Sequence, residues 1–218
     1  MKKILLFMVF CTLVLSLSAQ ELHLEPASGT VIIIDPGHGG RDFGAITSVA
    51  VDGTNVILRE KEINLQIANR LVTILQADHN EWRVLMTRTE DQYLTLEERS
   101  TLIMKDDREA IRISLHQNAS TITKTRGFTV YYSDWNSKPL ADRIAQELTN
   151  TVGSVIQARG VKQYDFPHGN ESARNTIMIE CGFLSNEYEA LLLADEEIQL
   201  KIATGIAQGI EEYLKIEV

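Results

Sequence analysis

Cysteine is scarce in this sequence, which excludes a fold held together by disulfide bonds. Only two cysteines occur among the 218 residues, Cys11 and Cys181. Cys11 lies in an N-terminal segment that we expect to be removed, so Cys181 is left without an intramolecular partner. The fold must therefore depend on its hydrophobic core, and the lone thiol is best tolerated if it is buried.

Positive charge is also limited, because 21 lysines and arginines face 30 aspartates and glutamates, which gives a formal net charge of −9. An acidic protein repels nucleic acid and anionic membranes, so we expect neither as a partner. The sequence also lacks internal repeats, low-complexity tracts and an interdomain linker. Its length suits one domain with a complete hydrophobic core, since such domains commonly hold about 100–200 residues.

The N-terminus has the layout of a secretory signal peptide. Two lysines are followed by an apolar run over residues 4–15 and by small residues up to Ala19. The apolar run is shorter than the roughly 20 residues that span a bilayer, so we favour cleavage over a stable membrane anchor. We therefore predict a signal peptide at residues 1–19, a mature chain at residues 20–218, and an exported protein that is periplasmic or extracellular.

Strand-like and helix-like segments alternate along the mature chain, which indicates an α/β sandwich. Apolar, β-branched runs predict buried strands, and apolar residues spaced every four positions predict helices packed on the sheet. The expected strands are Val31–Asp35, Arg83–Thr87, Ala110–His116, Phe128–Tyr132 and Thr176–Glu180. The expected helices lie around residues 63–75, 91–104, 140–148 and 198–214.

Four polar residues stand where predicted strands end or helices begin, and ligand sites of α/β proteins gather at such positions. His38 follows the first strand in a glycine-rich loop, and His116 ends a later strand. Glu60 opens a helix, but Glu62 fits the same place, where an acid complements the helix dipole. Glu180 ends a strand suited to burial, where a carboxylate is costly unless it is paired or binds a metal.

Two imidazoles and a carboxylate form the ligand set of a catalytic zinc site that leaves one position open for water. A further carboxylate beside such a site is a candidate general base. Taken singly, each residue also fits a structural role, such as a turn histidine or an acid in an ion pair. Asp35 is a candidate acceptor for the imidazole of His38, three residues later, and Asn118 is a candidate support for the site.

The motifs VIIIDPGHGG, REKEINLQIANRL, VLMTRTEDQYLTLEERS, ISLHQNA and IMIECGFLSNEYEA cover nearly all of the mature chain. In this order they resemble those of the zinc-dependent N-acetylmuramoyl-L-alanine amidases of the Amidase_3 family. The resemblance implies a single catalytic domain with a mixed, mostly parallel sheet sandwiched by helices. It implies that peptidoglycan is the substrate, and that the amide between N-acetylmuramic acid and L-alanine is hydrolysed.

The resemblance also implies a role for each candidate residue. One Zn²⁺ would be bound by His38, Glu60 and His116, and the choice of Glu60 over Glu62 follows because the family ligand directly precedes a lysine. Glu180 corresponds to the catalytic glutamate, which precedes the Gly-Phe of the last motif. The stretch over residues 161–175 fits the family only loosely, which leaves the substrate contacts there undefined.

Some members of the family carry a helical insertion that blocks the zinc site. The segment after Gly127 leads from strand to helix without room for such an insertion, so we expect an open site, and we expect a monomer. A zinc peptidase is less favoured, because the sequence contains no H-E-x-x-H motif. A non-catalytic or activator-dependent cell-wall-binding protein is the other alternative, although all four candidate residues are present. Cys181 has no adjacent histidine, so we discount it as a nucleophile.

Overall fold

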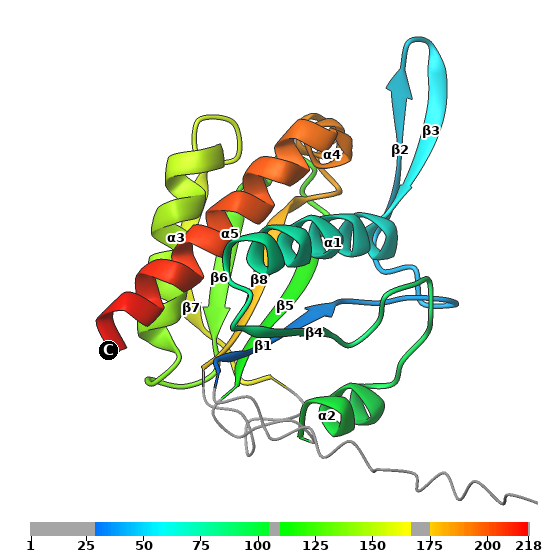
Figure 1. Cartoon of the computed structure of the whole chain (residues 1–218). Coiled ribbons are helices and arrows are strands. Elements are labelled where there is room, and N and C mark those ends of the chain that lie inside the picture. The colour runs from blue at the N-terminus through cyan, green and yellow to red at the C-terminus, as the bar shows by residue number, and fades with distance from the viewer. Residues whose placement is uncertain (1–28, 105–109, 167–174, 218) are drawn as a thin grey trace, which may run out of the picture.

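A six-stranded sheet forms the centre of the computed structural model, which describes residues 29–104, 110–166 and 175–217 (Figure 1). Four of its five strand pairings are parallel, and only β6 with β8 is antiparallel. The order is β4 (Arg83–Met86), β1 (Val31–Pro36), β5 (Ile111–Asn118), β8 (Thr176–Phe183), β6 (Phe128–Tyr132) and β7 (Ala158–Gln163). The predicted mixed, mostly parallel sheet is therefore confirmed.

Three long helices cover one face of this sheet, and their apolar stripes explain why they pack there. They are α1 (Glu60–Asp78), α3 (Lys138–Val152) and α5 (Glu196–Glu217). Ile67, Leu71 and Leu75 of α1 recur on one side of the helix and are fully buried in the main core. The stripes of α3 and α5 join the same core, so burial of apolar side chains stabilises this layer.

The opposite face of the sheet is covered over β1 by α2 (Leu96–Met104), which begins with a capping box. The backbone N–H of Glu98 donates to the Thr95 hydroxyl, and the backbone N–H of Thr95 donates to the Glu98 carboxylate. The helix was predicted around residues 91–104, but residues 91–94 lie in the preceding loop.

A β-hairpin of β2 (Ile46–Val51) and β3 (Thr54–Arg59) projects from the main sheet (Figure 1). The sequence analysis missed this hairpin, and it also missed β7 and the short α4 (Glu187–Ala194). Asp52 and Gly53 both have positive φ angles at the hairpin turn. An Asp-Gly pair between two β-rich runs is a strong hairpin signal, so this element was predictable.

Cys181 is fully buried, as expected for a lone thiol, and burial raises its pKa further above the usual range. The predicted signal peptide at residues 1–19 lies outside the described residues. Among the residues that are described, no helix is both long and apolar enough to span a membrane. The chain passes from β6 to α3 through a short connection over residues 133–137, which agrees with the predicted absence of an inserted helix there.

Asp35 connects β1 to three neighbouring elements and so holds α2 against the sheet. Its carboxylate accepts hydrogen bonds from Thr87 (2.6 Å), Arg99 (2.6 Å) and Ser114 (3.0 Å), and Arg112 Nη2 lies 3.3 Å away. Burial alone would raise the pKa of Asp35, but Arg112 and Arg99 hold that pKa well below its usual range. The ionised carboxylate is therefore a structural requirement of this layer.

Replacing Asp35 by asparagine should lower the free energy of unfolding by about 3–5 kcal/mol at pH 7, the usual cost of breaking a buried ion pair. The difference from wild type should shrink as the pH falls below about 4. A carboxyl whose folded-state pKa is depressed contributes its full stability only above its unfolded pKa, and loses it as the pH falls toward the folded value. Urea unfolding at several pH values from 7 to 3 measures both effects.

Asp142→Asn is the matched control, because Asp142 forms an exposed ion pair with Lys138 within α3. Exposed pairs contribute less than about 1 kcal/mol, so this variant should unfold almost as wild type does. Equal losses of stability in the two variants would contradict the role assigned to Asp35.

Candidate metal centre

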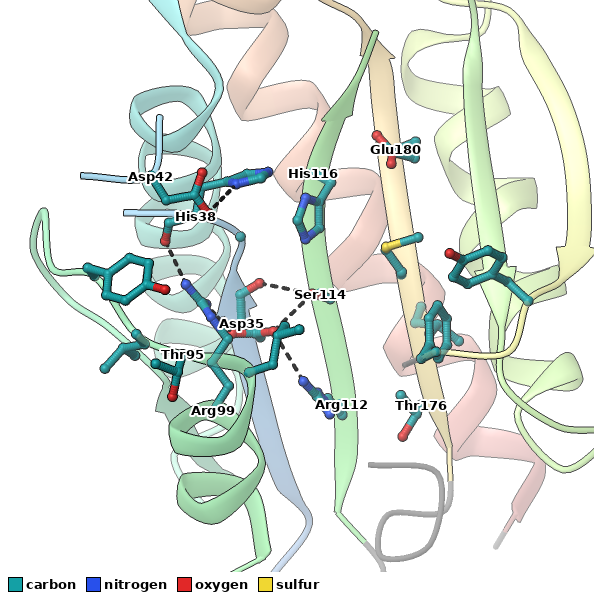
Figure 2. A pocket seen from close by; sticks show the side chains of 18 residues that line it. Asp35, His38, Asp42, Thr95, Arg99, Arg112, Ser114, His116, Thr176 and Glu180 are labelled. Carbon is teal, nitrogen blue, oxygen red and sulfur yellow. Dashed lines mark hydrogen bonds and ion pairs between the residues drawn. The ribbon is translucent and has the colours of Figure 1, made fainter. Parts of the chain in front are cut away.

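A cleft of about 580 Å³ opens at the carboxyl ends of the parallel strands (Figure 2). The loop after β1 contributes His38, β5 contributes His116 and β8 contributes Glu180. His116 and Glu180 are direct neighbours in the register of β5 and β8, so sheet pairing fixes their separation. Three of the predicted site residues therefore line one cavity.

The carboxylate of Glu60 lies between the two histidines. Its Oε1 atom is 3.1 Å from His38 Nε2 and 3.0 Å from His116 Nδ1, and one ligand atom from each residue lies within 4.8 Å of the others. Glu60 is only 4% exposed, because it occupies the first turn of α1 beneath the loop. The predicted trio is thus brought together, whereas Glu62 pairs with Arg59 instead.

The charge state of this trio suits cation binding. Burial by itself would raise the pKa of Glu60, but the neighbouring imidazoles of His116 and His38 hold it well below the usual range. The backbone N–H groups of Ala45 and Gln117 also donate to this carboxylate. An ionised carboxylate with two imidazoles is a donor set that matches a divalent transition metal, with zinc as the usual choice.

Two glycines leave the space in which these side chains meet. A Cβ atom on Gly37 would collide with the ring of His116. A Cβ atom on Gly44 would collide with the Glu60 carboxylate and with the ring of His38, and Gly44 also has a φ of 64°. The backbone therefore forms a cradle around the trio, and larger residues at these two positions would displace its side chains.

Asp42 orients the ring of His38. Its Oδ2 atom is 2.8 Å from His38 Nδ1, so the imidazole donates a proton there and keeps the lone pair of Nε2 directed at the cluster. Paired backbone hydrogen bonds between Gly39 and Asp42 fold the loop back and make this contact possible. The sequence analysis did not assign Asp42 this role. A separation of four residues within a loop does not show that the side chains of His38 and Asp42 are in contact.

The prediction that Asp35 accepts this hydrogen bond is wrong, because its carboxylate points to Thr87, Arg99 and Ser114. Its link to the site is indirect. Arg99 donates from Nη1 to Asp35 and from Nη2 to the backbone carbonyl of His38, which has a φ of 61°. Asp35 thus positions Arg99, and Arg99 positions the strained backbone of His38.

Glu180 is the unpaired acid of the cleft. Its Oε2 atom is buried and has no hydrogen-bond partner among the described residues. Burial raises the pKa of Glu180 to about 7, although the neighbouring His116 acts in the opposite direction. A carboxyl group with such a pKa exchanges protons readily at neutral pH, and buried acids of this kind concentrate at functional sites.

Asn118 does not lie among the residues that line the cleft. Its side-chain oxygen accepts from the backbone N–H of Ala119 (2.8 Å), and its backbone carbonyl accepts from Leu184 (2.8 Å). The bond from Leu184 joins the end of β5 to the end of β8. The predicted supporting role of Asn118 remains a prediction, and its contacts are with the backbone that follows the two strands.

A cluster of two imidazoles and a carboxylate beside a separate unpaired acid is typical of metal-dependent hydrolases. The Amidase_3 family model, described as N-acetylmuramoyl-L-alanine amidase, matches residues 32–212. The chain therefore belongs to the Amidase_3 family, and the predicted enzyme class is confirmed.

Similarity to individual proteins extends over most of the chain. It is 31% identical over 209 residues to YqiI of Bacillus subtilis, covering 94% of this chain and 95% of that protein. It is 29% identical over 189 residues to the probable cell wall amidase LytH of Staphylococcus aureus, covering 87% of this chain and 60% of LytH. The solved CwlD amidase of Clostridioides difficile, in complex with the GerS lipoprotein, has a TM-score of 0.75 and 32% identity. That match covers 86% of this chain and all of the CwlD chain.

Gly44→Ala should weaken zinc binding by about tenfold or more, since disturbing the shell around metal ligands commonly costs 10–100-fold in affinity. The added Cβ would displace both Glu60 and His38. Competition with a fluorescent chelator measures the zinc affinity of each variant directly.

Gly53→Ala is the matched control, because Gly53 also has a positive φ of 77° but a Cβ there would meet nothing within 4 Å. It carries the same backbone strain in the β2–β3 turn without touching the cleft, so its zinc affinity should equal that of wild type. Equal weakening by both substitutions would refute the proposed cradle.

Proposed function

We propose that the protein is a zinc-dependent amidase that hydrolyses the amide between N-acetylmuramic acid and L-alanine in peptidoglycan. His38, Glu60 and His116 would bind one Zn²⁺, and Glu180 would act as the general base. The observation that carries this proposal is the unpaired, buried carboxylate oxygen of Glu180 beside a cluster of two imidazoles and one carboxylate. Three such protein ligands leave a fourth tetrahedral position for water or substrate.

The chain's residues divide the chemistry between them. A bound Zn²⁺ supplies Lewis acidity toward a carbonyl and lowers the pKa of water. Because burial brings the pKa of Glu180 to about 7, this carboxylate can accept a proton from the attacking water. The same group can then return the proton to the leaving amine of L-alanine, which would otherwise depart as a poor leaving group.

Hydrogen bonds from neighbouring groups hold the candidate ligands in position. Asp42 fixes the tautomer of His38, and the backbone N–H groups of Ala45 and Gln117 fix the carboxylate of Glu60. The bond to Asp42 uses Nδ1 of His38 and so leaves Nε2, which faces the cluster, for a cation. Preorganisation of this kind lowers the cost of binding both the metal and the substrate carbonyl.

Export is part of the proposal, because peptidoglycan lies outside the cytoplasmic membrane. Residues 1–19 would act as a cleaved signal peptide and residues 20–218 as the mature enzyme. The description of LytH as a probable cell wall amidase supports this location for a related chain.

An activator-dependent enzyme of the same fold is the second candidate. The solved CwlD chain, which is similar over 86% of this protein, was captured in complex with the GerS lipoprotein. In this candidate, a partner protein would be required for turnover even though the zinc ligands and Glu180 are in place. Purified protein that binds zinc but hydrolyses peptidoglycan only after addition of a partner would favour it.

Glu180→Gln should keep zinc bound and lower turnover by about 10²–10⁴-fold, because the amide cannot accept a proton while its size is preserved. Glu60→Gln should instead lose zinc, because the substitution removes the only carboxylate of the cluster. Metal content by mass spectrometry and release of stem peptide from purified peptidoglycan measure the two effects separately.

Glu62→Gln is the control for both variants, because Glu62 lies on the same helix as Glu60 but pairs with Arg59 away from the cluster. It should bind zinc and hydrolyse peptidoglycan as wild type does. Full activity of Glu180→Gln would show that another group is the base.

A further inference from the structure

The cleft continues beyond the histidines along β5 to Arg112. His116, Ser114 and Arg112 alternate along this strand and face the same side of the sheet, and all three line the cleft (Figure 2). A rise of about 3.3 Å per residue places Arg112 roughly 13 Å along the strand from His116. One continuous cavity therefore joins the metal cluster to a guanidinium group.

At this far end, the described residues around Asp35 carry more positive than negative charge. The buried carboxylate of Asp35 faces two guanidinium groups, at 2.6 Å from Arg99 and at 3.3 Å from Arg112. Arg99 makes the shorter bond and also donates to backbone carbonyls of Pro36 and His38. Arg112 makes the longer contact, and among these described residues two guanidinium groups face a single carboxylate.

Arg112 also has an unused hydrogen-bond donor. The residue is 9% exposed, and its Nε atom is buried without a hydrogen-bond partner in the part of the chain that the structure describes. A buried guanidinium with an unpaired N–H is costly, because water is excluded and no acceptor replaces it. Arg112 lines the cleft, so its guanidinium group as a whole, and not the shielded Nε atom, is what a ligand would approach.

We propose that Arg112 binds a carboxylate of the stem peptide on the side of L-alanine. This inference rests on the proposed amidase function. It adds a second point of substrate recognition, a peptide carboxylate bound away from the metal cluster. Guanidinium and carboxylate groups form strong, charge-assisted hydrogen bonds with defined geometry. The rings of Tyr164 and Phe166, 5.4 Å apart between centroids, line the same cleft and offer an apolar surface to the peptide.

The length of the cleft selects which carboxylate is bound. An extended peptide spans at most about 3.3–3.6 Å per residue, so 13 Å corresponds to about four residues from the scissile amide. The carboxylate of a tetrapeptide stem would therefore reach Arg112 while the scissile amide lies at the metal cluster, and a tripeptide would fall about one residue short.

The test uses zinc-loaded protein and muramoyl tripeptides and tetrapeptides whose C-terminal group is either a free carboxylate or a carboxamide. Wild type should hydrolyse at least one free acid with a kcat/KM about tenfold or more above that of its amide. Arg112→Met should abolish this preference, so that the acid and the amide are hydrolysed with similar kcat/KM. Asp35 keeps Arg99 as its partner in this variant, so the fold should persist.

Arg143→Met is the matched control, because it removes the same charge from an exposed position on α3 and should retain the preference. Arg112→Lys keeps a cation beside Asp35. It therefore tests the inference even if the methionine variant does not fold. It should lose most of the preference, since an ammonium group cannot reproduce the planar donors of arginine.

Binding of the free stem peptides, followed by calorimetry, separates this inference from the proposed reaction. Tighter binding of the acid than of the amide, lost in Arg112→Met, would support the carboxylate site even if no muropeptide were hydrolysed. Equal affinity and equal kcat/KM for acid and amide in wild type would overturn it, even if amidase activity were strong. Loss of the preference in Arg143→Met as well would overturn it too.

Discussion

The buried carboxylate of Glu60 is the interaction on which the rest of the site depends. It lies within hydrogen-bonding distance of His38, in the loop after β1, and of His116 on β5, and it accepts from the backbone of Ala45 and Gln117. Groups from the β1–β2 connection and from β5 therefore converge on one side chain in the first turn of α1. A buried charge requires such compensation, so the position of the helix and the position of the histidines constrain each other.

Asp35 plays the corresponding role on the opposite side of β1. It keeps α2 attached through Arg99, and the same arginine holds the backbone of His38. The ion pair that fixes α2 thus also fixes the loop that presents His38, one of the three candidate metal ligands. The second arginine of this cluster, Arg112, also lies near Asp35 and lines the cleft, where we propose that it meets a ligand.

Much of the fold was predictable because buried strands and amphipathic helices leave periodic apolar patterns. The exposed hairpin and β7 bury little, so apolar periodicity could not reveal them, although Asp52-Gly53 signalled the hairpin turn. His38, His116 and Glu180 were found because parallel strands bring their carboxyl ends together. The partner of His38 was assigned wrongly to Asp35, since the fold of a glycine-rich loop depends on backbone hydrogen bonds that leave no pattern in the sequence.

Release of peptide beginning with L-alanine from purified peptidoglycan is the most direct test of the central claim. The assay should be run on the mature protein as purified, after treatment with a chelator, and after zinc is added back. The account predicts release that stops with the chelator and returns with zinc. Release that continues without metal, or no release from folded protein with zinc bound, would contradict it.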